Sequence, residues 1–385
     1  MKDLAVSFVE SIADIGADTW NALAGTDNPF TRYEFLWSLE YTGCTTRKTG
    51  WQPHHVLVRR VTPSLDEPVA VMPLYLKSNS WGEYVFDWSW ANAYEGHGLS
   101  YYPKFVTSAP FTPSYGKRLF IRDGEAQEPI LSRIKDAILE RADFVQASSW
   151  HVLFPTEEQH TAFTGAGLLP RIACQFHWYN RGYDSFADFL ANLSSRKRKN
   201  LNKERSRVAE AGITFRRVEG ADISDTLWNE FYVFYQSTYM MRGMQGYLSR
   251  GFFKQLGSAM PEQLVMICAE LEGNTIAAAL YFKSGDTLYG RYWGSAQDYQ
   301  FLHFETCFYQ GQDYAIEHGY RRIDPGAQGE HKIQRGFEPI LTYSNHWIAN
   351  PAFSDAIADF LREEAQHIKR YREQAESLLP YRKQT

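Results

Sequence analysis

Apolar and polar positions recur with two different periods along this chain, and the period changes from segment to segment. Apolar residues about 3.6 positions apart predict helices, whereas alternation and short apolar runs predict strands. The expected helices cover residues 14–24, 34–41, 128–144, 156–166, 224–241, 250–259, 303–319 and 353–376. The expected strands cover residues 4–9, 54–60, 68–76, 149–154, 175–179, 213–218, 263–271, 275–283, 287–294 and 321–324. Strands and helices mixed in this order predict an α/β or α+β fold with helices on the faces of a sheet.

The order of elements is similar in the two halves of the chain. Each half shows helices, then a strand hairpin, then a further strand and helix, which indicates a duplicated architecture without a fixed sequence repeat. A chain of 385 residues also exceeds the usual size of one hydrophobic core. We therefore expect two domains, residues 1–180 and 181–385.

One segment, Asp286 to Pro339, predicts a ligand site. It reads as a strand, a helix that ends at Gly319, and a short returning strand, which together form a crossover unit. The stretch that follows, residues 325–339, is polar and glycine-containing, with too little apolar periodicity for a core element. Polar loops at the ends of strands in crossover sheets are where ligands tend to bind.

Composition narrows the class of protein. With 44% hydrophobic and 16% aromatic residues, the chain is expected to fold over most of its length. Its four cysteines lie far apart, which argues against a disulfide framework and a zinc knuckle. We find no apolar run near the roughly 20 residues of a membrane helix and no apolar core of a signal peptide. A cytoplasmic protein without a membrane span is therefore expected.

A basic run at residues 195–207 is the strongest charge feature. It holds seven basic residues and one acidic residue within a segment expected to be helical. Like charges this dense repel one another on a helix, so contact with phosphate of a nucleotide cofactor or of RNA is favoured over a merely solvated surface. The candidate phosphate-binding residues are Arg196, Arg198, Lys199 and Asn200.

A second candidate for phosphate binding is the pattern R-x-x-G-x-A at Arg291, Gly294 and Ala296. In GNAT acyltransferases this pattern wraps backbone amides around the pyrophosphate of coenzyme A. The pattern is permissive, so a chance match is the alternative. The histidines show no H-E-x-x-H motif and no recognised ligand spacing, and no G-x-S-x-G motif is present, so neither a metal nor a serine nucleophile is expected.

Several longer words in the sequence resemble one known family. They are M-P-L-Y-L-K (72–77), G-E-Y-V-F-D-W-S-W-A (82–91), Y-Y-P-K (101–104), P-F-T-P (110–113), Q-F-H-W (175–178), L-Y-G-R-Y-W-G (288–294), L-H-F-E (302–305) and G-A-Q-G-E-H-K-I-x-R-G-F (326–337). In this order they resemble the FemAB-like N-acyltransferases of the GNAT superfamily, which are related to the Fem peptidyltransferases. The resemblance covers nearly the whole chain and implies two tandem GNAT-like domains, each a mixed sheet flanked by helices.

The resemblance also implies an activity, amide formation by acyl transfer. The expected donor is acyl-CoA or aminoacyl-tRNA, and the expected acceptor is a small-molecule or peptide amine, including one related to peptidoglycan; tRNA is then a partner. Such chemistry needs a base for the amine and a cation near the carbonyl. The catalytic candidates are Lys332 and Arg335 as cations, and Glu305, Asp324 and Glu330 as bases. The candidates for acceptor binding are Asp87, Trp88, Tyr94, Tyr102 and His303.

The match to the Fem enzymes is incomplete at the candidate catalytic lysine. Arg198-Lys-Asn-Leu201 is similar to their basic helix, but the spacing from Lys332 or Arg335 to Gly336-Phe337 departs from theirs. The alternative to an enzyme is a non-catalytic binding module that recognises an aminoacylated or peptide ligand. We expect Lys332 to lie exposed on its loop, so that its replacement would change turnover and not stability.

Overall fold

The structure is a computed structural model that describes residues 3–327 and 329–382. By its internal contacts the chain divides into two units. Unit 1 holds the described residues up to Ala173 together with Leu341–Lys369, and unit 2 holds Cys174–Ile340 together with the described residues from Arg370 onward. The expected single division near residue 180 therefore misses the late return of residues 341–369 to the first unit.

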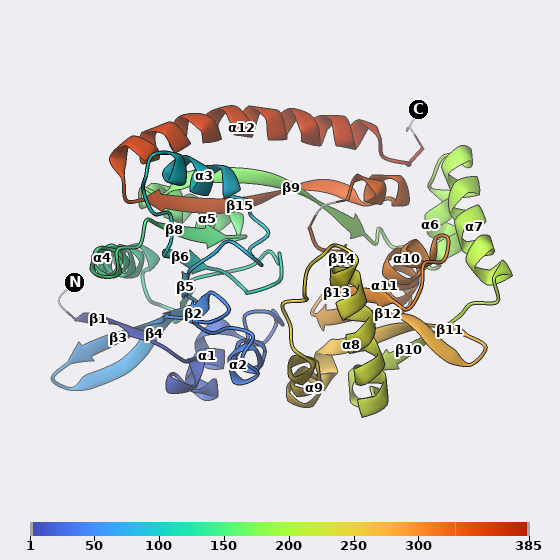
Figure 1. The fold of residues 1–385 in the computed structure, drawn as a ribbon, viewed down its shortest axis with the longest axis horizontal. Helices are drawn as coiled ribbons and strands as arrows, with labels where there is room; N and C mark the ends of the chain where they lie inside the picture. The colour runs from blue at the N-terminus through green and yellow to red at the C-terminus, as the bar shows by residue number, and fades with distance from the viewer. Residues whose placement is uncertain (1–2, 328, 383–385) are drawn as a thin grey trace. The chain divides into compact units, whose positions relative to one another are not determined.

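Unit 1 contains two sets of paired strands (Figure 1). The first is antiparallel in the order β1-β3-β4-β7, formed by β1 (Leu4–Val9), β3 (His55–Thr62), β4 (Leu65–Met72) and β7 (Phe120–Ile121). The second runs β15-β8-β6-β5-β2, formed by β15 (Glu338–Ile348), β8 (Ser149–Leu153), β6 (Lys104–Thr107), β5 (Tyr75–Lys77) and β2 (Trp51–Pro53). The β3–β4 hairpin and the parallel β6–β8 pair give unit 1 its mixed character.

The helices of unit 1 cover these strands with apolar faces. They are η1 (Ile12–Asp14), α1 (Ala17–Ala24), α2 (Tyr33–Tyr41), α3 (Trp88–Gly96), α4 (Gln127–Val145), α5 (Glu157–Gly165) and most of α12 (Pro351–Ser377). In α4, Ile130, Ile134 and Ile138 recur every four residues and pack in one core with Val58 and Trp150. The helical period read from the sequence thus coincides with the buried face.

Residues 341–369 belong to unit 1 for two physical reasons. Strand β15 pairs antiparallel with β8, with Ser344 opposite Leu153 and Ile348 opposite Ser149. Helix α12 buries Ile357 in a cluster with Trp90 of α3. Neither α3, β6 nor β15 was expected, because the stretches that hold them are rich in Trp, Tyr, Gly and polar residues and show no clear period.

The sheet of unit 2 carries the candidate site. Its order is β10-β11-β12-β13-β14-β9, formed by β10 (Thr214–Glu219), β11 (Leu264–Leu271), β12 (Asn274–Ser284), β13 (Thr287–Ser295), β14 (Arg322–Asp324) and β9 (Leu169–Tyr179). Strands β13 and β14 are parallel, and the other pairs are antiparallel. The crossover predicted between residues 287 and 324 is confirmed.

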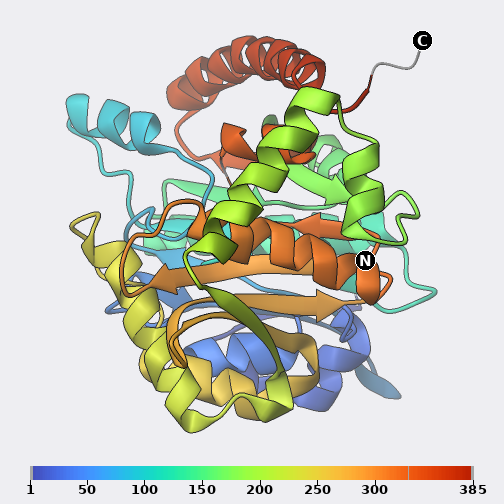
Figure 2. The same cartoon turned by 90° about the vertical axis from the view of Figure 1, so that its right-hand side faces the viewer.

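Helices lie on both faces of the unit 2 sheet (Figures 1 and 2). They are α6 (Phe186–Ala191), α7 (Ser195–Glu210), η2 (Gly220–Asp222), α8 (Asp225–Met240), α9 (Arg250–Ala259), η3 (Pro261–Gln263), α10 (Leu302–Phe304), the π-helix η4 (Glu305–Tyr309), α11 (Gln310–Glu317) and η5 (Glu330–Arg335). Helix α8 packs on one face, and α11 packs on the other, where Ala315 shares a core with Ile267 and Tyr281. The mixed α/β class, with sheets flanked by helices, is confirmed. Among the described residues, no helix is both long and apolar enough to cross a membrane.

Candidate functional site

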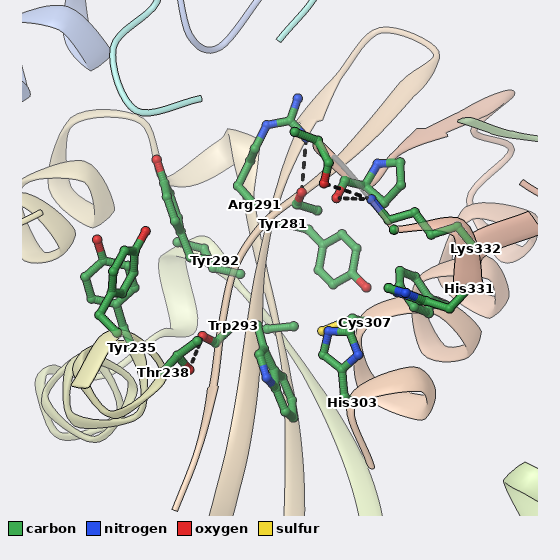
Figure 3. A pocket seen from close by; sticks show the side chains of 18 of the residues that line it. Tyr235, Thr238, Tyr281, Arg291, Tyr292, Trp293, His303, Cys307, His331 and Lys332 are labelled. Carbon is green, nitrogen blue, oxygen red and sulfur yellow. Dashed lines mark hydrogen bonds between the residues drawn. The ribbon is translucent and has the colours of Figure 1, made fainter. Parts of the chain in front are cut away.

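A cavity of about 430 Å³ opens in unit 2 beside strand β13 (Figure 3). Tyr235 and Thr238 of α8 lie on one side of it, and His331 and Lys332 of η5 lie on the other. Tyr281 of β12 lies between these walls. The cavity is therefore lined partly by the crossover segment that the sequence predicts as a ligand site. It is also lined by α8, a helix that the sequence analysis did not assign to that site.

The wall formed by α8 depends on a glycine. A Cβ atom at Gly294 would lie 1.9 Å from the carbonyl oxygen of Phe234, so any side chain there would push α8 away from β13. The hydroxyl of Thr238 donates to the carbonyl oxygen of Trp293 at 3.1 Å and stabilises the same packing. Gly294 thus lies inside a strand and serves close packing, and the predicted phosphate-binding loop at residues 291–296 is not formed.

A β-bulge sets the position of Arg291. Leu280 pairs with Tyr292 and Tyr281 pairs with Gly290, so Arg291 is the extra residue of β13. Its guanidinium donates from Nη2 to Oδ2 of Asp324 at 2.7 Å, and both side chains are almost fully buried. Burial alone would raise the pKa of Asp324, but Arg291, His177 and the backbone N–H of Gly326 together outweigh burial and hold that pKa well below its ordinary value. Asp324 is therefore a bound carboxylate and does not meet the expectation of an available base.

Lys332 is buried, with only 4% of its surface exposed, so the expectation of an exposed loop lysine is wrong. Its Nζ atom donates to the carbonyl oxygens of Gly326, Ala327 and Pro325 at 3.0, 3.3 and 3.4 Å. Burial lowers the pKa of Lys332 to about 8. Helix η5 is held beside the cavity because it buries Ile333 in the same hydrophobic core as Phe337.

Two histidines line the cavity beside Lys332. The rings of His303 and His331 have their centroids 6.1 Å apart. Burial, reinforced by neighbouring positive charge, lowers the pKa of His303 to about 4; the ring of His331 is only partly buried and much of the residue is exposed, but partial burial and the same charges lower its pKa to about 4 as well, so both rings are neutral at pH 7. Within the described part of the chain neither ring makes a hydrogen bond, which leaves their nitrogens available to a ligand. His303 is among the residues predicted from the sequence, whereas His331 is not.

The other catalytic candidates do not line the cavity. Arg335 donates to Glu204 at 2.8 Å and lies 3.5 Å over the ring of Phe304. Glu305 is paired with Arg205 at 3.0 Å, and burial raises its pKa. Glu330 is exposed and accepts a hydrogen bond from Tyr371 at 3.0 Å.

These three side chains therefore stabilise the structure around the cavity and do not face it. The lining residues that the sequence analysis missed include Tyr235, Tyr239, Arg242, Tyr281, Cys307 and His331. No local pattern marks them, since α8 reaches the cavity only through its packing on β13. Among the described residues, we find no group of three or more His, Cys, Asp or Glu side chains able to hold a metal ion.

A family model described as peptidoglycan biosynthesis/recognition matches residues 11–383. The chain belongs to the FemAB-like family. None of the curated proteins matches the sequence. Membership in this family supports a transferase of acyl or aminoacyl groups.

Solved structures with a similar fold include FemX, with 13% identity, a TM-score of 0.50, and coverage of 89% of this chain and 97% of that chain. A tandem GNAT protein from the clavulanic acid biosynthesis pathway gives 10% identity, a TM-score of 0.48, and coverage of 90% and 99%. The C-terminal domain of a putative lysylphosphatidylglycerol synthetase from Agrobacterium fabrum gives 11%, 0.48, and coverage of 89% and 94%. At these identities the likenesses concern the fold.

The basic helix of this FemAB-like protein, α7, has two chemically different sides. Leu201 and Val208 are buried, and Arg205 turns toward Glu305 and Asp313. Among the outward residues, Arg196, Lys199 and Asn200 are exposed and Arg198 is half-buried. In the described chain, the basic side chains of Arg196, Arg198 and Lys199 form no ion pair. The helix prediction is confirmed, and these residues remain candidates for binding phosphate.

The proposed acceptor residues of the FemAB-like chain are divided between the units. Asp87, Trp88, Tyr94 and Tyr102 lie in unit 1, whereas His303 lies in unit 2. Tyr94 is buried, with its ring 4.0 Å from that of Phe353. The hydroxyl of Tyr102 pairs with that of Ser80 at 2.8 Å, and the ring of Trp88 lies 4.9 Å from that of Trp81. Trp81, which packs beside Trp88, is exposed.

Asp87 belongs to a buried charged cluster, which we define as Lys77, Glu83, Asp87 and Lys104. The two lysines lie opposite each other on β5 and β6. Lys104 donates to Glu83 at 2.8 Å and also to Asp87, while Lys77 lies 3.9 Å from Glu83 and 3.7 Å from the centroid of the Trp51 ring. Burial lowers the pKa of Lys77 to about 7 and raises that of Glu83 to about 7. Asp87 is therefore committed to Lys104 and is not an open acceptor site.

Proposed function

We propose that this protein forms an amide by transferring an aminoacyl group from aminoacyl-tRNA to an amine of a small-molecule or peptidoglycan-related acceptor, and that the bond forms in the unit 2 cavity. The observation that carries the proposal is the placing of two neutral imidazoles beside a buried lysine in an aromatic cavity. A proton acceptor and a positive charge at one point are what amide formation from an ester requires.

In this proposal the acceptor amine attacks the ester carbonyl carbon of the donor. Its proton passes to the imidazole of His303 or His331, and negative charge develops on the carbonyl oxygen. The positive charge of Lys332 favours that oxyanion through its field, because all three of its N–H groups already reach carbonyl oxygens of residues 325–327. When the carbon–oxygen bond of the ester breaks, the imidazolium returns the proton to the leaving hydroxyl of the tRNA.

Two features favour tRNA over coenzyme A as the donor. The outward side of α7 carries Arg196, Arg198 and Lys199, and such a row of cations suits an extended phosphate backbone. The connection from β13 to α10, residues 296–301, has no glycine and contains Asp298, so it lacks the close, uncharged backbone that cradles a pyrophosphate.

The test is a transfer screen with two readouts, release of deacylated tRNA and release of free thiol from acyl-CoA. We expect tRNA release, and we expect Arg196→Gln/Arg198→Gln/Lys199→Gln to weaken tRNA binding and to reduce its salt dependence. The slope of log K against log salt should fall by about 0.7 to 0.9 for each phosphate group that the variant no longer neutralises. The matched control is Arg47→Gln/Lys48→Gln/Lys117→Gln, which removes the same charge from exposed positions of unit 1.

Each alternative has a distinct outcome. Thiol release with unchanged tRNA affinity in the α7 variant would overturn the choice of donor. Ligand binding without transfer to any amine would indicate the binding module instead of the enzyme.

A further inference from the structure

The unit 2 cavity has an excess of positive charge. Arg242, Arg291 and Lys332 line it, and no described lining residue is acidic. Arg291 is compensated by Asp324 in a buried ion pair at 2.7 Å, but Lys332 is held only by carbonyl oxygens. Arg242, in the turn after α8, is exposed and forms no ion pair within the described chain. Within the described chain neither Arg242 nor Lys332 forms an ion pair, although the nearby carboxylate of Asp324 also acts on Lys332.

This excess positive charge lowers the pKa of both cavity histidines. Arg242, Lys332 and Arg335 each contribute, after burial, to lowering the pKa of His303, and Lys332 and Arg335 do so for His331. The nearby carboxylates already have partners, because Glu204 accepts a hydrogen bond from Arg335 and Glu330 accepts one from Tyr371.

Cys307 and Tyr281 also line the cavity, and burial raises the pKa of both side chains, so neither adds negative charge at pH 7. Each neutral imidazole therefore offers one N–H donor to an anion, and uptake of a proton would add a second.

We propose that the cavity is an oxyanion-binding site, in which a carboxylate or phosphate group of a substrate is held by Arg242, His303 and His331. The site deepens the proposed function by naming a substrate group, and it rests on that function only in placing the reaction in the same cavity. An anion bound here compensates the excess charge, so proton uptake by the rings becomes more favourable. Because the ordinary pKa of 6.5 still lies below pH 7, the rings stay mostly neutral when the anion is bound, and each becomes a stronger base for the amine proton.

The experiment is a pH titration of the imidazole signals by NMR, with the rings assigned through His303→Asn and His331→Asn. The probes are inorganic phosphate and acetate, each compared with sodium chloride at equal ionic strength. We expect saturable binding of an oxyanion that raises the pKa of both rings from about 4 toward their ordinary value of 6.5. Binding of phosphate alone would assign a phosphate ester as the substrate group, and binding of acetate would assign a carboxylate.

Arg242→Gln should weaken binding of the oxyanion about 10-fold or more, as expected when one charge-assisted hydrogen bond is removed. Arg250→Gln, which removes an exposed arginine of α9 outside the cavity, is the matched control and should change nothing. Absence of a saturable shift with either probe, or equal weakening in the two variants, would overturn the inference. Transfer activity measured in the absence of anion binding would overturn this inference alone, whereas anion binding without transfer would overturn the proposed function alone.

Discussion

Each unit buries lysines against its sheet, but the surroundings of these lysines differ. In unit 1, Lys104 has carboxylate partners, Glu83 and Asp87, and the buried charged cluster has equal numbers of positive and negative groups. In unit 2, Lys332 has only carbonyl oxygens and faces a cavity. The cluster of unit 1 is balanced in charge, although Oε1 of Glu83 and Oδ1 of Asp87 have no hydrogen-bond partner among the described residues, whereas the cavity of unit 2 has an excess of positive charge.

This difference shows that burial of a charged side chain does not by itself indicate a functional site. All four side chains of the unit 1 cluster have a shifted pKa, yet burial and their mutual pairing account for those shifts. A perturbed pKa therefore marks a site only when an open space and uncommitted groups accompany it. Substitutions of these lysines and of the cavity histidines would test that distinction.

Removing the central cation of unit 1 should have the largest effect on stability. Lys104→Met leaves Glu83 and Asp87 buried beside one remaining lysine, and breaking a buried pair in this way costs about 3–5 kcal/mol. Urea unfolding would measure the change. The exposed Lys117→Met is the matched control and should stay within about 0.5 kcal/mol of the parent protein. An equally small decrease in stability in both variants would show that the cluster is not a structural pair.

Lys332→Met tests the other side of the comparison. We expect turnover to fall about 100-fold, comparable with the removal of one oxyanion-stabilising group. Stability should also fall, by about 1–3 kcal/mol, because three carbonyl oxygens are left without their donor. The matched variant is Lys77→Met in unit 1, which should affect stability and leave the turnover of the folded protein unchanged. If Lys332→Met behaves in the same way as Lys77→Met, the cavity is not the place of reaction.

Acid should weaken unit 2 through its cavity histidines. The pKa of His303 and of His331 is about 4 in the folded chain against 6.5 ordinarily, so the unfolded chain binds more protons between these values. Stability that is present above pH 6.5 is therefore reduced as the pH falls toward 4. Unfolding at a series of pH values should show a shallower decrease for His303→Asn/His331→Asn, and an identical decrease would contradict the assignment.

A smaller effect should appear in alkali. The pKa of Lys332 is about 8 when folded and 10.5 ordinarily, so the unfolded chain binds more protons in this window and stability should rise with pH relative to Lys332→Met. For Lys77, with a pKa of about 7, the rise should begin at lower pH. Urea midpoints compared across this range, parent against each variant, would reveal the order, and a reversed order would contradict it.

The sequence was informative where the period was clear. Helix α9 matches its expected range, Arg250–Ala259, and the parallel pair β13–β14 follows from the crossover pattern. The π-helix η4 was not foreseen, because one extra residue per turn barely alters the apolar period of residues 303–319. Strand β6 was missed within aromatic, glycine-containing sequence that gives no period.

The site was predicted in part for similar reasons. Lys332 and His303 lie in the segment expected to bind a ligand, and both line the cavity. That Lys332 is buried could not be read from its polar neighbours in sequence, because its partners are backbone carbonyl oxygens. Tyr239 and Arg242 come to the cavity through the packing of a separate helix, which no local spacing encodes.

The close packing of Gly294 against Phe234 has a consequence for how substrate choice can change during evolution. Because no side chain fits at Gly294 between β13 and α8, an exchange there would displace the whole wall that carries Tyr235 and could not adjust it in small steps. Adaptation to a larger or smaller substrate must therefore come from the opposite wall, at His331, or from the turn that carries Arg242. Libraries aimed at new acceptors should vary those two places and leave Gly294 unchanged.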